Sequence, residues 1–189
     1  FPLFLMILIS NLNMLYTQLD KIILGFYGKD MEQIAYYGVA QKVVSILMVM
    51  PMSIITVIIS RLSNYLGEGK KIEYEELLNN GLSFFYLILF PIAIGIGIMS
   101  EEICLILGGE KYLPAKMVVV LFGVRLIIVS TASVLINQVL FLNRKEKIVM
   151  KILIICGVLN LSFKIMITYM KILNENTAIL TTIFSEIIM

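Results

Sequence analysis

Residues 117–142 read MVVVLFGVRLIIVSTASVLINQVLFL, and Arg125 is the only charged side chain in this run. A helix needs about 20 consecutive apolar residues to cross the ~30 Å hydrocarbon core of a bilayer. The run is longer than that, and only helical backbone can satisfy its own polar groups in lipid. The stretch therefore predicts a membrane-spanning helix that carries a permanent positive charge.

The rest of the chain has the same character. Of its 189 residues, 60% are hydrophobic and 15% charged, and the mean hydropathy is +0.98. Soluble domains are about 45–50% apolar and ~25% charged. The lipid bilayer is therefore the expected environment. A net charge of +2 gives no argument for nucleic acid as a partner. The absence of histidine from the sequence excludes Ser-His and Cys-His catalysis and histidine metal sites, so we expect no cofactor and no metal.

The apolar blocks predict an all-α membrane protein with a six-helix bundle. Five complete spans and one partial span are expected at residues 2–27, 34–63, 78–99, 114–142, 148–170 and 177–189 (partial). Pro51 and Pro91 fall inside the second and third spans and should kink them. Because the chain starts at Phe1-Pro2 and stops inside the run TAILTTIFSEIIM, we expect a piece of a longer protein, cut inside its last helix.

The connections between spans alternate in charge. Those after the second and fourth spans carry seven cations, and the other three carry four. The seven are Arg61, Lys70, Lys71, Arg144, Lys145, Lys147 and Lys151. Since basic loops stay in the cytoplasm, these two connections are predicted to be cytoplasmic. The segment EEICLILGGEKYLPA at 101–115 is too short to span, and we expect it on the outer surface or as an extension of the helix ends.

Charged side chains inside spans are costly and usually face a bundle interior or a wet cavity. They are Asp20, Lys21, Lys42, Arg125, Lys164 and Glu186. Lys21, Lys42 and Lys164 lie about six residues below the outer end of their helices, roughly 9 Å down, and Arg125 roughly 16 Å down, near the midplane. A layer of cations in one cavity suits an anionic, phosphate-bearing cargo.

Simpler explanations compete with this cavity. The three lysines are close enough to a helix end to snorkel to the surface, and Asp20 can neutralise a lysine. Stripes of serine and glycine also serve helix packing. Arg125 is the hardest residue to explain in these ways, because it is the deepest.

Several stretches, taken in order, resemble the second half of the Wzx-type polysaccharide flippases, which belong to the multidrug/oligosaccharidyl-lipid/polysaccharide exporter superfamily. They are LDKIILGFYG (19–28), AYYGVAQKVV (35–44), SRLS (60–63), GEKYLPA (109–115), NRKEK (143–147), GVLNLSF (157–163) and TAILTTIFSE (177–186). The resemblance covers essentially the whole chain. The first two stretches are its strongest pair.

The resemblance implies the second of two helix bundles around a central cavity, working by alternating access in the bacterial cytoplasmic (inner) membrane. The implied cargo is an undecaprenyl-diphosphate-linked oligosaccharide for capsule, O-antigen or exopolysaccharide assembly. The implied protein partners are the missing N-terminal bundle and a polysaccharide polymerase. Family cavity positions match Asp20, Lys21, Gln41 and Lys42, whereas the cavity argument contributes Arg125 and Lys164.

The chain departs from the family pattern at three places. Ser60-Arg61 replaces a proline, Lys164 follows Asn160 where the family has a second asparagine, and Asn176-Thr177-Ala178 lacks a glycine. The lysine adds a cation to the cavity face, which favours a more acidic cargo.

The predicted cargo-binding residues are Lys21, Gln41, Lys42, Arg125, Asn160 and Lys164, and the predicted ion-coupling carboxylates are Asp20 and Glu186. Three alternatives remain: a multidrug or cation antiporter, a lipid II flippase, and a membrane enzyme such as a polymerase or glycosyltransferase. The predicted site residues include four cations and two carboxylates, and this ratio argues against an organic cation as the cargo. The acidic segment GKKIEYEELL at 69–78 is typical of a solvated amphipathic helix rather than of a catalytic loop, so we expect no enzyme.

Overall fold

The computed structural model describes residues 18–28 and 30–188, which are helical almost throughout. Residues 18–27 are helical, and they are followed by α2 (Glu32–Gly67), α3 (Lys71–Ile98), α4 (Ser100–Gly108), the 3₁₀ helix η1 (Glu110–Ala115), α5 (Lys116–Val134), the π-helix η2 (Leu135–Phe141), α6 (Glu146–Tyr169) and α7 (Glu175–Ile187). The all-α prediction is confirmed for this part of the chain. Most of the first predicted span, at residues 2–17, lies outside it.

Within residues 18–28 and 30–188, four segments are long and apolar enough to cross a membrane: Glu32–Gly67, Lys71–Ile98, Glu110–Phe141 and Glu146–Tyr169. Only 17% to 39% of their most apolar windows is buried inside the fold. Large apolar side chains such as Val57 and Ile98 therefore point outward, where they are 75% and 76% exposed. So much outward apolar surface requires lipid around it, and the chain is a membrane protein.

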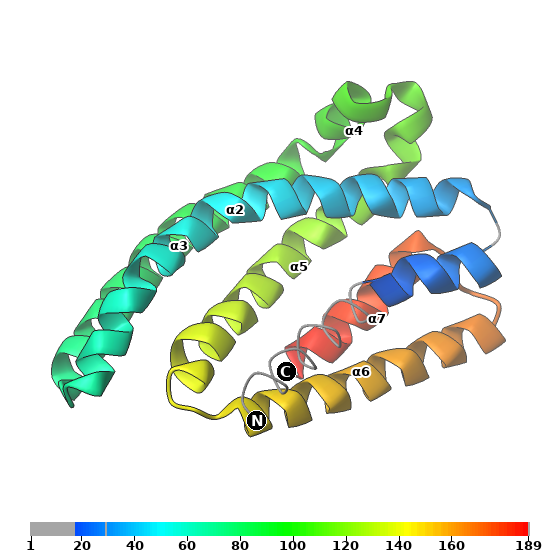
Figure 1. Cartoon of the computed structure of the whole chain (residues 1–189). Coiled ribbons are helices and arrows are strands. Elements are labelled where there is room, and N and C mark those ends of the chain that lie inside the picture. Colours follow the sequence, from blue (N-terminus) through cyan, green and yellow to red (C-terminus); the bar gives the residue numbers. More distant parts are fainter. Residues whose placement is uncertain (1–17, 29, 189) are drawn as a thin grey trace.

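The helices pack side by side around one apolar core. Helix α2 packs along α3 and α5, whereas α7 packs against α5 and α6 (Figure 1). Tyr37, Phe85, Phe122 and Ile179 are fully buried between them. Gly123 of α5 lets this helix approach α3 closely, because a methyl group there would lie 3.3 Å from the carbonyl oxygen of Ala93.

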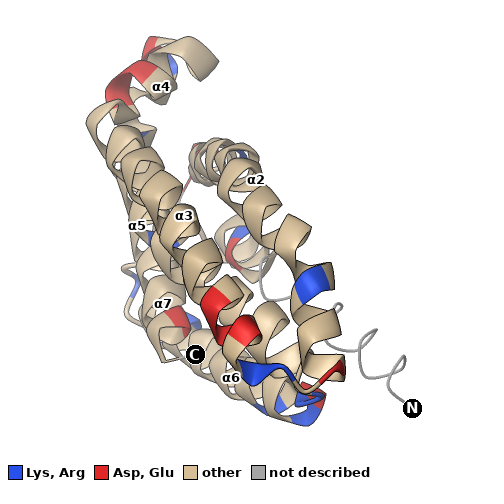
Figure 2. Ribbon diagram, turned by 90° about the vertical axis from the view of Figure 1, so that its left-hand side faces the viewer, with Lys and Arg blue, Asp and Glu red and all other residues tan. Residues whose placement is uncertain are grey.

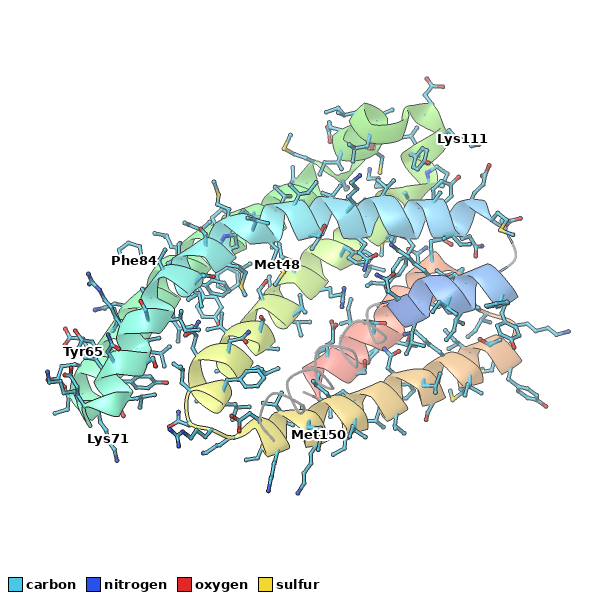
Figure 3. The ribbon with its side chains drawn as sticks, viewed as in Figure 1. Met48, Tyr65, Lys71, Phe84, Lys111 and Met150 are labelled. Atoms are coloured by element: carbon cyan, nitrogen blue, oxygen red, sulfur yellow. The ribbon has the colours of Figure 1, made fainter. Side chains whose placement is uncertain are left out.

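The connections gather at opposite ends of the molecule. The α2–α3 and α5–α6 connections lie at the lower left in Figure 1, whereas the start of α2, α4 and the α6–α7 connection lie toward the upper right. The labelled side chains agree, with Tyr65 and Lys71 at one end and Lys111 at the other (Figure 3). The two basic connections therefore share one end, as the predicted alternation requires.

Three helix ends close with the same backbone turn. Gly69, Arg144 and Lys171 all have a positive φ, of 73°, 55° and 57°. In each case the next residue's amide donates to the carbonyl oxygen five residues earlier, at 2.9, 2.9 and 3.2 Å. This left-handed cap usually contains glycine, but two of the three positions here hold a cation.

The helix bounds differ from the predicted spans mainly at α3 and α5. Helix α3 begins at Lys71, because the amphipathic segment predicted at 69–78 continues directly into the third span. The segment 101–115 forms α4 and η1. Figure 1 shows α2 bending in its middle, and Pro51 lies in this part of the helix.

The fourth predicted span is helical, and its last part, η2, has π-helical backbone. Two side-chain amides satisfy carbonyl groups there. Asn137 Nδ2 donates to Ser133 O and Asn143 Nδ2 donates to Val139 O, both at 2.7 Å. Gln138 is buried in this segment, and its backbone carbonyl oxygen accepts the Tyr74 hydroxyl at 2.7 Å. This bond connects η2 to α3.

Candidate functional site: two buried ion pairs

A buried polar cluster lies where residues 18–27, α2, α5, α6 and α7 meet. Its members are between 0% and 7% exposed. They are Asp20, Tyr37, Arg125, Asn160, Lys164, Thr182, Ser185 and Glu186. Polar groups at this depth in a membrane bundle are tolerated when they pair with one another, and these do.

Helical spacing brings the members from α6 and α7 onto facing surfaces. Asn160 and Lys164 are one turn apart on α6, and Thr182, Ser185 and Glu186 follow the i, i+3, i+4 pattern on α7. A capping box sets the start of α7. In it, the Asn174 side chain accepts the Thr177 amide at 2.8 Å and Thr177 Oγ1 accepts the Asn174 amide at 2.9 Å.

Asp20 and Lys164 form the first buried ion pair. The Asp20 carboxylate also accepts the Tyr37 hydroxyl and Thr182 Oγ1, the latter at 2.8 Å. Three helices besides its own therefore supply donors to this carboxylate. Asp20 neutralises a lysine, as one simple explanation anticipated, but that lysine is Lys164 and not the adjacent Lys21.

The ammonium group of Lys164 donates its other hydrogen bonds within the same cluster. Its ammonium donates to Asn160 Oδ1 and to Thr182 Oγ1 at 3.1 Å. Asn160 Nδ2 in turn donates to Ser185 Oγ at 3.0 Å. These bonds compensate the cost of removing an ammonium group from water.

Arg125 and Glu186 form the second buried ion pair, with two-pronged geometry. Arg125 Nε donates to Glu186 Oε2 at 2.8 Å, and Nη2 donates to Oε1. The guanidinium carbon lies 5.7 Å from the centre of the Phe122 ring. Phe122 meets the Tyr37 ring edge-on at a centroid distance of 4.9 Å. Because Tyr37 bonds to Asp20, Phe122 and Tyr37 connect the two ion pairs.

This pairing corrects the predicted layer of four cations open to one cavity. Arg125 and Lys164 are enclosed in the bundle with carboxylate partners, because an unpaired charge at that depth costs several kcal/mol, about 3–5 when one partner of a buried pair is removed. The two carboxylates predicted to couple ions, Asp20 and Glu186, are those partners. What these four residues do in transport stays a prediction.

Lys21 and Lys42 lie outside the buried polar cluster. The Lys21 side chain is half-buried against α2, where a methyl group on Gly38 would lie 4.0 Å from Lys21 Cε. Lys42 follows one turn later on α2 and is exposed, and Gln41 beside it is half-buried. Neither lysine forms a salt bridge with a described residue.

A groove of about 600 Å³ runs between α5–η2, α6 and α7. Its lining is apolar and includes Ile128, Val139 and Ile152, with Glu186 as a charged member. Among the eight predicted site residues, only Glu186 lines this groove. The predicted cargo-binding residues therefore lie outside this groove, and three of them, Arg125, Asn160 and Lys164, are buried in the bundle.

Three members of the buried polar cluster were missed from the sequence. Thr182 and Ser185 stand at helical spacing from Glu186, and that spacing could have identified them. Tyr37 gave no such signal, since it follows another tyrosine in an apolar stretch.

A model of a family described as polysaccharide biosynthesis protein matches residues 4–118, which is more than half of the chain. Searches of the curated proteins and of the solved structures find no match to the chain.

Proposed function

The chain belongs to this family of polysaccharide biosynthesis proteins, and we propose that it flips an undecaprenyl-diphosphate-linked oligosaccharide across the bacterial cytoplasmic membrane. In this proposal the cargo serves capsule, O-antigen or exopolysaccharide assembly, and the protein performs no covalent chemistry. Its proposed partners are an N-terminal bundle of the same protein and a polysaccharide polymerase.

The observation that carries the proposal is the buried polar cluster in a membrane protein of this family. A purely structural bundle would have little reason to place four charges in its interior, since apolar residues of similar size are often as stable. Charges inside a membrane bundle indicate by default a functional site, such as a substrate or ion pathway. The family membership directs that function to polysaccharide export.

Lys21, Gln41 and Lys42 are proposed contacts of the cargo. Two ammonium groups near one stretch of α2 offer point charges for a diphosphate. Lys21 and Lys42 need no partner exchange to bind it, because neither has a salt bridge among the described residues.

The two ion pairs are the proposed coupling device. Protonation of Asp20 or Glu186 would weaken its pair and release Lys164 or Arg125 to an anionic cargo. Asn160 would then hold the freed Lys164 ammonium. This mechanism joins the predicted cation sites and the predicted coupling carboxylates in one cluster with two states, as alternating access requires.

Reconstituted full-length protein tests the function. Proteoliposomes should move lipid-linked oligosaccharide between leaflets, and the double variant Lys21→Gln/Lys42→Gln should move it at least tenfold more slowly. Lys111→Gln/Lys116→Gln is the control, because it removes the same charge from exposed salt bridges at the helix ends.

Four outcomes would contradict the proposal. Transport of an organic cation instead would indicate the antiporter, and transport of lipid II alone would indicate the peptidoglycan precursor. Transfer of a radiolabelled sugar would indicate an enzyme. An unchanged rate in the Lys21/Lys42 variant would remove these residues from the cargo path.

A further inference from the structure

We propose that the apolar groove between α5–η2, α6 and α7 binds one anionic phospholipid, whose headgroup lies on the basic turn at the end of the groove. The basic turn is the segment 143–151, with the cations Arg144, Lys145, Lys147 and Lys151. This site is separate from the proposed cargo contacts on α2 and does not depend on them.

The groove suits a hydrocarbon chain. Its walls are branched aliphatic side chains, including Ile128, Ile136 and Val139. Its two polar members are already satisfied. Thr131 Oγ1 donates to Ile127 O at 2.8 Å, and Glu186 is paired with Arg125. An acyl chain can therefore lie in the groove without breaking a polar contact.

The basic turn suits a phosphate group. All four cations are exposed, and none forms a salt bridge with a described residue. Helix α6 begins directly behind Lys145 without a side-chain cap, so its first amides are also directed at this place. Figure 2 shows basic residues at this end of the molecule, with acidic residues among them.

Backbone geometry holds this turn in place. Arg144 adopts a left-handed conformation, with φ 55°, fixed by hydrogen bonds from Arg144 N to Phe141 O and from Lys145 N to Leu140 O, at 3.0 and 2.9 Å. Glycine would adopt this conformation at a lower energetic cost, because it has no Cβ atom. An arginine at this position places its charge at the end of the groove despite the cost.

The groove and the basic turn are continuous. Leu140, which lines the groove, lies three residues before Asn143, and Ile152, which lines its other wall, directly follows Lys151. From Ile128 to Leu140 the groove extends roughly 18 Å along the helix axis. One leaflet of the hydrocarbon core is about 15 Å thick.

This length selects a phospholipid over the polyprenyl-linked cargo. A phospholipid chain whose headgroup lies on the basic turn ends near the middle of the bilayer, where the groove also ends. A polyprenyl chain is much longer and would extend beyond it. The side with the most basic connections is the one where anionic headgroups attract lysine and arginine.

Native mass spectrometry of the full-length protein with added lipid tests the site. Phosphatidylglycerol should bind at least tenfold more tightly than phosphatidylcholine with the same acyl chains. The triple variant Arg144→Gln/Lys145→Gln/Lys147→Gln should reduce this preference to near one, since each cation contributes about a fivefold gain near an anionic surface. The control Arg61→Gln/Lys70→Gln/Lys71→Gln, with the same charge change on the other basic connection, should retain it.

A second variant tests the groove itself. Ala132→Phe places a ring in the groove, where Ala132 is a lining residue, and should weaken both lipids severalfold while leaving the headgroup preference intact. Equal binding of the two phospholipids to the unaltered protein would overturn the proposal. So would an unchanged preference in the Arg144 triple variant, or tighter binding of a polyprenyl diphosphate than of phosphatidylglycerol.

Discussion

Arg125 shows what a single residue can and cannot reveal before the structure is known. Its depth follows from its place in an apolar run, because helix rise converts residue count into distance. Its partner does not follow, since Glu186 is 61 residues away and the pairing depends on how α5 and α7 rotate about their axes. The same holds for Lys164, whose partner Asp20 lies near the other end of the sequence.

The Arg125–Glu186 pair makes a prediction about stability. Arg125→Met or Glu186→Leu alone should lower the free energy of unfolding by about 3–5 kcal/mol, because each leaves a buried charge without a partner. The double variant should recover most of this loss, since both charges leave together. Thermal unfolding in detergent measures the three variants. A double variant as unstable as the two single losses combined would contradict the pairing.

If the pair also couples ions to transport, the double variant separates stability from activity. It should fold and reach the membrane at normal levels but flip cargo at least tenfold more slowly. Normal transport by the stable double variant would restrict Arg125 and Glu186 to a structural role.

Tyr37 provides a second test at this scale, with its neighbour as the control. Tyr37→Phe removes a buried hydrogen bond to the Asp20 carboxylate, and bonds to charged groups contribute about 1.5–3 kcal/mol. Tyr36 donates instead to Glu32, at 3.0 Å, whose side chain is 55% exposed. Tyr36→Phe should therefore lower the free energy of unfolding by less than Tyr37→Phe does. Equal losses in the two variants would show that Tyr37 does not stabilise Asp20.

At the scale of helices, apolar runs and charges located the elements well. They could not reveal the π-helical end of the fourth span, because its cause lies in tertiary contacts. Gln138 is buried there, and its backbone carbonyl oxygen accepts the hydroxyl of Tyr74, which lies 64 residues earlier in the chain. The sequence pattern around residues 135–141 does not indicate a hydrogen-bond partner so far away in the chain.

The packing around two helical glycines predicts how their replacement by alanine changes stability. Gly123→Ala should lower the melting temperature, because the new methyl group would lie 3.2 Å from Ile96 Cγ2 and 3.3 Å from Ala93 O. For Gly157 of α6, no heavy atom of a described residue lies within 4 Å of the corresponding position. Gly157→Ala should therefore be neutral or stabilise by up to about 1 kcal/mol through helix propensity. A stabilising Gly123→Ala would contradict the close approach of α3 and α5.

At the scale of the whole molecule, charge counting predicted which connections lie together, and the structure places the two basic ones at one end (Figure 2). The cation counts were sufficient for this, because the side on which a connection lies follows from its own charge and not from tertiary contacts. The proposed cargo site was harder to predict, since cations at similar depths on different helices can face a cavity or pair with carboxylates. Here Lys164 and Arg125 face carboxylates.

Orientation in the membrane can be measured with single cysteines. Cys104 and Cys156 are the two cysteines of the sequence, and both are buried. Replacing both with alanine gives a chain without thiols, into which single cysteines can be introduced. A cysteine at Arg144 should react with a membrane-impermeant reagent only from the cytoplasmic side. A cysteine at Lys111 should react from outside intact cells. The reverse pattern would overturn the assigned topology.

The two ion pairs also determine when the bundle can be completed during synthesis. A ribosome adding ~5–20 residues per second reaches Glu186 about 3 to 12 s after Arg125, the two being 61 residues apart. Until then Arg125 of α5 lacks its carboxylate partner, and Asp20 likewise has no ammonium partner until Lys164 is synthesised. Helix α7 arrives last among the described helices and supplies both Glu186 and Thr182. A nascent chain that stalls before α7 would therefore present unneutralised charge within the bilayer, a clear signal for membrane proteases.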